Sequence, residues 1–285
     1  MEVMVRIYKY FPPERIDVVE SARICFSSAK NLNDPFELKA PMQLYRSDEE
    51  MKATLLKSLP GIISAEYDNL PDWQKINLPK DQAMVMMLEI AAGQMDKMVR
   101  DLKDNLPALE VQIYERMSAS IGVLCLTETP NNLLMWAHYA GSHSGFVVEF
   151  DHQHEFFNQR RTEVDELRHL RKVLYAQERP ILFFENSDGT ELLLTKSHHW
   201  AYEQEWRMFM ALEDASSIKS NSIGDFHLFD FPIESVVSVT FGCRMNVGDK
   251  IRIRKAIEGH LHYNCRFYDT LVNPKIYELD MVEVS

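Results

Sequence analysis

Apolar residues form short runs along most of the chain. In one region they recur instead every three or four residues, as in a helix. Runs of β-branched and aromatic residues bounded by Pro, Gly, Asn or Asp are typical of strands. We expect strands at residues 3–10, 23–27, 121–126, 145–150, 172–175, the second half of 203–210, 226–231, 236–241, 265–268 and 276–279. The segment 121–126 is almost entirely apolar, which predicts a central strand covered on both faces.

Helical signals are concentrated between residues 47 and 118. Ser47 precedes three carboxylates, the pattern of a helix start in which a hydroxyl caps and negative charges face the positive end of the helix dipole. Asp81 is expected to cap a second helix, whose apolar residues recur at three- and four-residue spacing as far as Leu102. A third helix is expected at about 106–117.

Shorter helices are expected at 15–20, 131–139, from 192 toward 200, and at 247–262. Strands and helices are interspersed without the regular rhythm of a parallel βαβ sheet, which predicts an α+β fold. We therefore predict one α+β domain over residues 1–285. Its core would be a mixed or antiparallel split sheet with surrounding helices, and residues 47–118 would form a helical insertion.

Composition narrows the classes of protein. Hydrophobic residues make up 46% of the 285 residues, enough for a sizeable core. A net charge of −12 argues against broad electrostatic capture of DNA or RNA. The four cysteines lie far apart, the histidines lack the spacing of a zinc site, and no apolar run approaches the roughly 20 residues of a membrane helix. We expect a cytoplasmic protein with reduced thiols, no metal and no membrane association.

Methionines form a stripe along the expected second helix. Met84, Met87, Met95 and Met98 recur at helical spacing. Core packing is the simpler interpretation, because methionine fills irregular apolar gaps. A groove that binds a protein partner is the alternative.

Two segments place reactive side chains beside turns or aromatic residues. Residues 33–37 favour a tight turn, because Pro35 restricts the residue before it to an extended shape. Residues 135–139 place Trp136 and Tyr139 three positions apart, on one face of a short helix.

A third segment, residues 200–207, carries two carboxylates among aromatic residues. In a strand, Glu203 and Glu205 would point the same way and could form a partly desolvated acidic site. The alternative is an exposed strand face whose carboxylates pair with Arg207 or with nearby lysines.

Several of these residues together carry a family resemblance. In chain order they are Tyr8-Lys9-Tyr10, Phe26-Ser27, Asn33-Asp34-Pro35-Phe36-Glu37, Met135-Trp136-Ala137-His138-Tyr139, Gly145-Phe146, Tyr175 and Trp200-Ala201-Tyr202-Glu203-Gln204-Glu205-Trp206-Arg207. This order resembles a bacterial family known as domain of unknown function 2971. The resemblance spans most of the chain outside 47–118, and the family implies no activity.

A second resemblance concerns chemistry. A strand with an aromatic pair, a strand with a serine and a later Glu-x-Glu are similar to the layout of ADP-ribosyltransferases. The resemblance implies that Tyr8 or Tyr10 contacts the ribose of NAD and that Ser27 braces the site. Glu205 would be the catalytic carboxylate and Glu203 its helper, because a fixed carboxylate stabilises the oxocarbenium-like centre formed when nicotinamide leaves. The residues expected to bind NAD are Tyr8, Lys9, Tyr10, Ser27, Asn33, Asp34, Trp136 and Tyr139.

We therefore expect an NAD-consuming transferase or NAD glycohydrolase of the ADP-ribosyltransferase type, acting in bacterial conflict or phage defence. Two other classes stay open. A non-catalytic sensor would bind a ligand or a protein, with the methionine-rich helices as the protein contact. A magnesium-dependent nuclease would use Asp34, Glu37, Glu203 and Glu205 as ligands.

Overall fold

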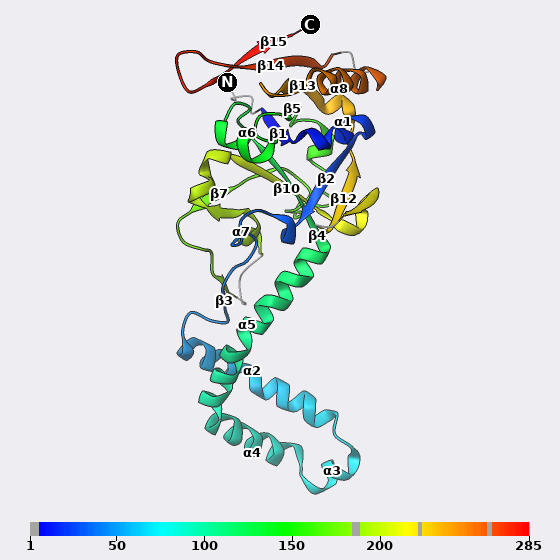
Figure 1. Ribbon diagram of the computed structural model, residues 1–285. Coiled ribbons are helices and arrows are strands. Elements are labelled where there is room, and N and C mark those ends of the chain that lie inside the picture. Colours follow the sequence, from blue (N-terminus) through cyan, green and yellow to red (C-terminus); the bar gives the residue numbers. More distant parts are fainter. Residues whose placement is uncertain (1–5, 184–188, 222–223, 261–263, 285) are drawn as a thin grey trace. The chain divides into compact units, whose positions relative to one another are not determined.

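A computed structural model describes residues 6–183, 189–221, 224–260 and 264–284 (Figure 1). The chain forms two compact units. The first comprises Met1–Leu38, Glu115–Arg179 and Leu193–Ser285, and the second comprises Lys39–Tyr114 and Pro180–Leu192. The second unit thus begins before residue 47 and takes in a segment that follows much later in the sequence.

The first unit is built on a mixed sheet. Its strands are β1 (Ile7–Phe11), β2 (Arg23–Ser28), β4 (Ile121–Thr127), β5 (Phe146–Phe150), β6 (Arg171–Lys172), β10 (Glu205–Ala211), β11 (Ser217–Asn221), β12 (Gly224–Asp230), β13 (Val236–Phe241), β14 (Arg266–Val272) and β15 (Leu279–Glu283). The order is β11-β12-β2-β4-β1-β5-β13-β14-β15, with β10 pairing β4 and β6. β13 and β14 are parallel and the other ladders are antiparallel. The predicted α+β fold is confirmed.

The sheet divides along one edge of β4. On its other edge β4 pairs with β10 over its whole length, from Glu205↔Thr127 to Ala211↔Ile121. On the divided edge β2 pairs only with Gly122 and Val123, and β1 pairs only with Thr127. Residues 124–126 therefore lie between two diverging strands.

Both faces of β1 are covered, and its alternation separates two apolar clusters. Ile7 and Phe11 belong to the main core, in which β4 and β5 are also buried. Tyr8 and Tyr10 pack on the opposite face with Trp136 of α6 (Leu133–Tyr139). This follows from the two-residue period of a strand.

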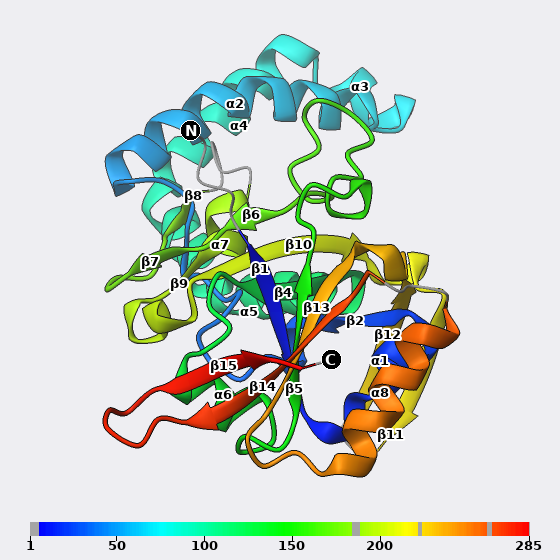
Figure 2. The same cartoon turned by 90° about the horizontal axis from the view of Figure 1, so that it is seen from above.

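Short helices surround this sheet. They are α1 (Asp17–Ser21), α6 and α8 (Val247–Gly259), with 3₁₀ turns η1 (Pro13–Arg15), η2 (Ala29–Asn31), η3 (Glu155–Phe157), η4 (His198–Glu203), η5 (Leu212–Asp214) and η6 (Ile233–Ser235). α7 (Thr190–Leu194) spans the boundary between the two units. α1 and α8 lie side by side at the β12 side of the sheet (Figure 2). The buried Ile253 and Ile257 of α8 join the main core.

Two expectations for the C-terminal half were wrong. The helix expected from 192 toward 200 stops at Leu194, because Thr195–Ser197 forms strand β9, which pairs in parallel with β7 (Leu174–Ala176). The strand expected at 276–279 begins only at Leu279. The side chain of Asn273 accepts hydrogen bonds from the next turn, so residues before Leu279 form a loop.

The second unit is mainly helical. Its elements are β3 (Met42–Gln43), α2 (Asp48–Asp68), α3 (Asp72–Asn77), α4 (Lys80–Gly93), the greater part of α5 (Met95–Ser120) and β8 (Leu182–Phe183). The Ser47 hydroxyl accepts a hydrogen bond from the Glu50 N–H at 3.1 Å, which confirms the predicted start of α2. No helix among the described residues is both long enough and apolar enough to cross a membrane.

The expected second helix was wrong at both ends. Asp81 lies inside α4, and Pro79 occupies the position before its first residue. The single helix expected to run toward Leu102 is interrupted after Gly93: α4 ends there and α5 begins at Met95. Glycine favours such a break because it loses the most backbone freedom in a helix.

Most of the methionine stripe is core. Met84, Met95 and Met98 pack in a cluster with Leu59 and Ile63 of α2. Met86 and Met87, by contrast, are exposed.

Candidate functional site

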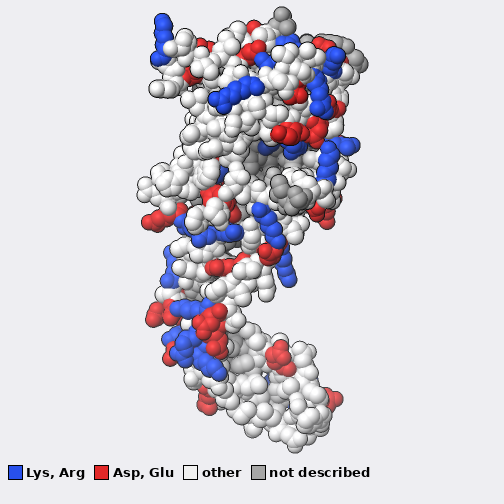
Figure 3. Space-filling view, in the orientation of Figure 1, with Lys and Arg blue, Asp and Glu red and all other residues white. Residues whose placement is uncertain are grey.

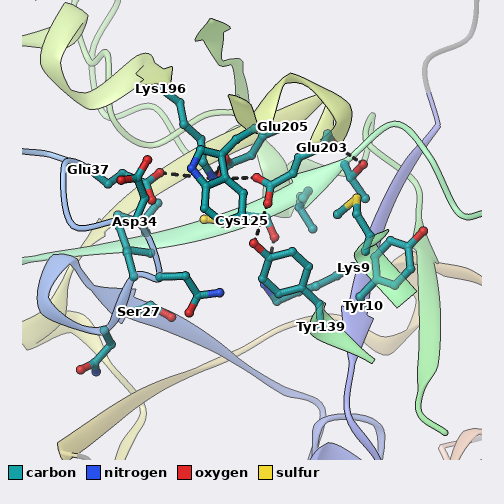
Figure 4. A pocket seen from close by; sticks show the side chains of 18 of the residues that line it. Lys9, Tyr10, Ser27, Asp34, Glu37, Cys125, Tyr139, Lys196, Glu203 and Glu205 are labelled. Carbon is teal, nitrogen blue, oxygen red and sulfur yellow. Dashed lines mark hydrogen bonds and ion pairs between the residues drawn. The ribbon is translucent and has the colours of Figure 1, made fainter. Parts of the chain in front are cut away.

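A cavity of about 250 Å³ lies where the sheet divides, entirely within the first unit (Figure 4). β1, β2 and β4 supply one side of it, and segments after β2 and before β10 supply the other. Its lining residues are Tyr8, Lys9, Tyr10, Ser27, Asn31, Leu32, Asn33, Asp34, Glu37, Val123, Cys125, Leu126, Thr127, Met135, Tyr139, Lys196, Trp200, Glu203 and Glu205.

The structure brings most of the sequence-predicted residues to this cavity. They are Tyr8, Lys9, Tyr10, Ser27, Asn33, Asp34, Tyr139, Glu203 and Glu205. Trp136 is the exception, and its expected place in the binding site was wrong. It is fully buried, its indole N–H donates to the carbonyl of Pro130 at 2.9 Å, and its ring packs edge-on against Tyr10.

Lys196 lies between three carboxylates. Its ammonium Nζ is 2.6 Å from Glu203 Oε2, 2.8 Å from Glu205 Oε2 and 3.5 Å from Glu37 Oε1. Burial lowers the pKa of Lys196, but the charges of Glu205 and Glu203 outweigh burial and raise it above its usual range. Lys196 is therefore a fixed cation in the wall of the cavity.

Arg207 is a second buried cation that contacts the same carboxylates. It is fully buried, and its Nε donates to Glu205 Oε1 at 2.8 Å while Nη2 contacts Glu205 Oε2 at 3.1 Å. It is also ion-paired with Glu37, and Nη1 donates to the carbonyl of Leu193 at 2.8 Å. Burial lowers the pKa of Arg207, yet with two carboxylates in contact the guanidinium stays charged at neutral pH.

The two glutamates do not share a strand, so the expected geometry of the Glu-x-Glu segment was wrong. Glu203 ends the 3₁₀ turn η4, and Glu205 is the first residue of β10. Gln204 between them is left-handed, with a φ of 45°. This local twist, rather than strand alternation, brings both carboxylates to the same ammonium.

Glu203 also faces the aromatic side of the cavity. Tyr139 of α6 donates its hydroxyl to Glu203 Oε1 at 2.5 Å (Figure 4). Burial and the neighbouring Glu203 raise the pKa of Tyr139, so the phenol stays protonated. α6 is positioned by Asn132, whose side chain accepts hydrogen bonds from the N–H groups of Leu134 and Met135.

Residues 33–37 form the predicted turn. Asp34 Oδ1 accepts a hydrogen bond from the Phe36 N–H at 2.9 Å, and the Asp34 carbonyl accepts one from the Glu37 N–H at 3.1 Å. The turn carries Glu37, which is 6% exposed, inward to Arg207.

The carboxylates are balanced by ion pairs rather than gathered as metal ligands. Within the described part of the chain, no group of three or more His, Cys, Asp or Glu side chains is placed to hold a metal ion. Burial raises the pKa of Glu205, and Lys196 opposes that shift.

Lys196 and Arg207 were not among the residues expected to bind NAD or to act in catalysis, and Glu37 was expected only as a metal ligand of the nuclease alternative. Arg207 and nearby lysines entered the sequence reasoning as pairing partners of the two glutamates. Arg207 lies two positions after Glu205 in β10, so strand alternation alone places the two side chains on one face. For the non-catalytic sensor, the sequence reasoning also expected Glu205 to be buried in a salt bridge to Arg207 or Lys196 with no cleft nearby; both ion pairs are present, and they lie beside a cavity.

A family model described as "Protein of unknown function (DUF2971)" matches residues 135–208. The resemblance to this family is thereby confirmed over a stretch that holds Tyr139, Lys196, Glu203, Glu205 and Arg207. The N-terminal residues of the cavity lie outside the match. No curated protein and no solved structure matches the chain.

Proposed function

We propose that the chain is an NAD-consuming enzyme that breaks the bond between nicotinamide and ribose, as a transferase or a glycohydrolase. The observation that supports this proposal best is the shared cavity. Two carboxylates, Glu203 and Glu205, line the same cavity as Tyr8, Tyr10 and Ser27, where the sheet divides. NAD consumption of this kind would fit a role in bacterial conflict or phage defence.

The proposed reaction starts with loss of nicotinamide. The bond between ribose C1 and the nicotinamide ring nitrogen breaks, and its electron pair leaves with nicotinamide, which becomes neutral. The positive charge that develops on the ribose is stabilised by a nearby carboxylate. Water or an acceptor hydroxyl then attacks C1 and gives its proton to a carboxylate.

Glu203 is better suited to the reacting position than Glu205. Glu205 has both oxygens held by Arg207, with Lys196 as a further contact. Glu203 has contacts only to Lys196 and Tyr139 among the described side chains, and it lies beside the aromatic wall. We therefore reverse the roles expected from sequence: Glu205 positions Lys196, and Glu203 faces the ribose.

The size of the cavity suits part of NAD. Pockets that enclose drug-sized ligands are roughly 300–1,000 Å³, and this cavity is about 250 Å³. It would enclose the nicotinamide and ribose end, and the remaining dinucleotide would lie outside.

Nicotinamide release tests the proposal. Purified wild type, Glu203→Gln and Glu205→Gln would be incubated with NAD, with and without acceptor proteins, and nicotinamide would be quantified by chromatography. We expect release by the wild type and a fall in kcat of about 100-fold or more for Glu203→Gln.

Glu213→Gln is the matched control, because Glu213 is exposed and follows β10. It should retain wild-type release. Melting temperatures of all variants would separate loss of chemistry from loss of fold. Absence of release by the folded wild type, or a wild-type rate for Glu203→Gln, would refute the proposal.

A non-catalytic binding module is the second candidate. The pairing of Glu205 with Arg207 and Lys196 favours it, because the oxygens of this carboxylate are already held by cations. It predicts that NAD or another nucleotide raises the melting temperature while no nicotinamide appears.

A further inference from the structure

Lys9 is the one partly exposed residue of β1, a strand that is otherwise buried. Its side chain lies at the divided edge of β4 and lines the cavity (Figure 4). Its Nζ donates to the carbonyl of Cys125 at 2.9 Å. This carbonyl lies between the parts of β4 that β1 and β2 cover, so Lys9 takes the place of a missing strand partner.

Lys9 also lacks a counter-ion among the described residues. Of the cavity carboxylates, Glu37, Glu203 and Glu205 pair with Lys196 or Arg207, and no described carboxylate is ion-paired with Lys9 Nζ. An ammonium that is largely removed from water and has no counter-ion loses part of its hydration, so it releases its proton more easily than an exposed lysine does. Burial accordingly lowers the pKa of Lys9.

We propose that Lys9 is a nucleophilic amine that forms an imine with the aldehyde of a small ligand, such as an open-chain sugar, bound in the same cavity. The inference does not depend on the proposed NAD chemistry. Desolvated lysines next to a ligand cavity are the usual source of such amines in proteins.

The reaction balances without a further reagent. The Nζ lone pair attacks the aldehyde carbon, and the carbonyl oxygen takes up a proton to give a carbinolamine. The C–O bond then breaks, and the oxygen leaves as water with the two protons that the amine has lost. The product is a C=N bond between Lys9 and the ligand.

The rest of the cavity suits a polyhydroxylated aldehyde. Carboxylate and amide oxygens of Glu203, Asp34 and Asn33 can accept hydrogen bonds from sugar hydroxyls, and all three line the cavity with Lys9. Tyr8 and Tyr10 offer aromatic surface on the neighbouring wall. The volume of about 250 Å³ accommodates a small sugar.

The charged and titratable groups around Lys9 come from several elements. After burial, the largest influences on the pKa of Lys9 come from Cys125 of β4 and Cys25 of β2, followed by Arg15 of η1 and Glu205 of β10. Burial raises the pKa of Cys125 well above its usual range, so this thiol is neutral and does not serve as a counter-ion.

Reductive trapping tests the inference. The full chain would be incubated with glycolaldehyde or D-ribose and sodium cyanoborohydride at pH 7, digested, and mapped by mass spectrometry. Lys172 is the internal control, because its side chain is 55% exposed and ion-paired with Glu128. We expect labelling of Lys9 about tenfold or more above that of Lys172, since an ordinary lysine is protonated at this pH.

The pH dependence gives a second readout. Between pH 9 and pH 7 the labelling of an ordinary lysine falls about tenfold per pH unit, whereas that of Lys9 should fall less because burial lowers its pKa. Lys9→Arg should lose the adduct at this position alone. Labelling of Lys9 at or below the level of Lys172 would overturn the inference, and the result is independent of nicotinamide release. Because sites are mapped in the wild type, the test does not require the variant to fold.

Discussion

Arg207 compensates the charges of two buried carboxylates. It is fully buried and contacts both Glu205 and Glu37, while Lys196 contacts the same pair and Glu203. Such a cluster is not by itself a source of stability, because each charge loses its hydration. Removal of one member, however, leaves its partners buried and uncompensated.

Arg207→Met should therefore lower the free energy of unfolding by about 3–5 kcal/mol. Arg23→Met is the matched control: Arg23 pairs with Asp230 on the surface, and its loss should cost less than about 1 kcal/mol. Urea denaturation of the three proteins measures both values. Equal losses for the two variants would contradict the account of the cluster.

For single residues, the sequence predicts which side chains belong to the site more reliably than it predicts their contacts. Glu203 and Glu205 were found as a pair, but the strand geometry expected for them was wrong. The left-handed Gln204 carries no sequence signal, because glutamine is not among the residues that favour this conformation. Lysines near Glu203 and Glu205 were expected from sequence as pairing partners, but the contact of Lys196 with three carboxylates at once depends on the fold.

At the scale of elements, β1 and β5 approach each other too closely for a side chain at Gly145. A Cβ there would lie 2.0 Å from the carbonyl oxygen of Phe11, and backbone cannot move aside as a flexible side chain can. The residue precedes β5, whose register with β1 sets the position of Tyr8 and Tyr10.

Gly145→Ala should consequently cost about 3 kcal/mol or more. Gly61→Ala in α2 is the matched change: no atom outside its own helix lies within 4 Å of the new Cβ, so a gain of about 0.5–1 kcal/mol is expected. Thermal and urea unfolding of both variants and the wild type would measure the two changes in the free energy of unfolding. A neutral Gly145→Ala would show that β1 and β5 are not packed as described.

Asp165, in the loop before β6, should make the stability of the fold depend on pH. Burial alone would raise the pKa of Asp165, but the backbone N–H groups of Arg161, Leu167 and Arg168 lower it to about 2. Since the folded-state pKa lies below the usual 3.8, this stabilisation is present above pH ~4 and is lost as the pH falls through about 2.

Asp165→Asn should thus lower stability by about 1–2 kcal/mol at pH 7, and this difference should shrink steadily as the pH is lowered below about 4. Urea midpoints of both proteins across this range measure it. A difference that does not change with pH would contradict the proposed hydrogen bonding.

At the scale of the molecule, the second unit carries apolar surface that its own core does not cover. Val85, Met86 and Ile90 of α4 are exposed, as are Trp73 and Ile76 of α3. Figure 3 shows few charged side chains over α3 and α4 on the visible face. Exposed apolar surface of this kind is typical of a contact with another protein.

The double variant Met86→Lys and Ile90→Lys should bind much less of the dye 1-anilinonaphthalene-8-sulfonate than the wild type, because it removes apolar surface. The double variant Gln82→Lys and Gln94→Lys adds the same charges at exposed polar positions at the ends of α4 and should bind as much dye as the wild type. Fluorescence titration compares them. Equal dye binding by all three would refute an accessible apolar surface on α4.

The α+β class and most elements of the first unit follow from local patterns. Strands such as Val236–Phe241 are short, mostly apolar runs whose ends are marked by the flanking residues. The division of the sheet at β4 does not follow from such patterns, because it depends on which of three partners pairs with each residue of one strand. The break between α4 and α5 was missed because the apolar period continues across it.

The central claim is that the carboxylates at the divided sheet stabilise a positive charge on ribose. The most direct measurement is the kinetic isotope effect for nicotinamide release from NAD deuterated at the ribose carbon bonded to nicotinamide, under single-turnover conditions. We predict slower release from the deuterated substrate, because this carbon becomes planar as the charge develops. No release from either substrate, or equal rates for the two, would contradict the account.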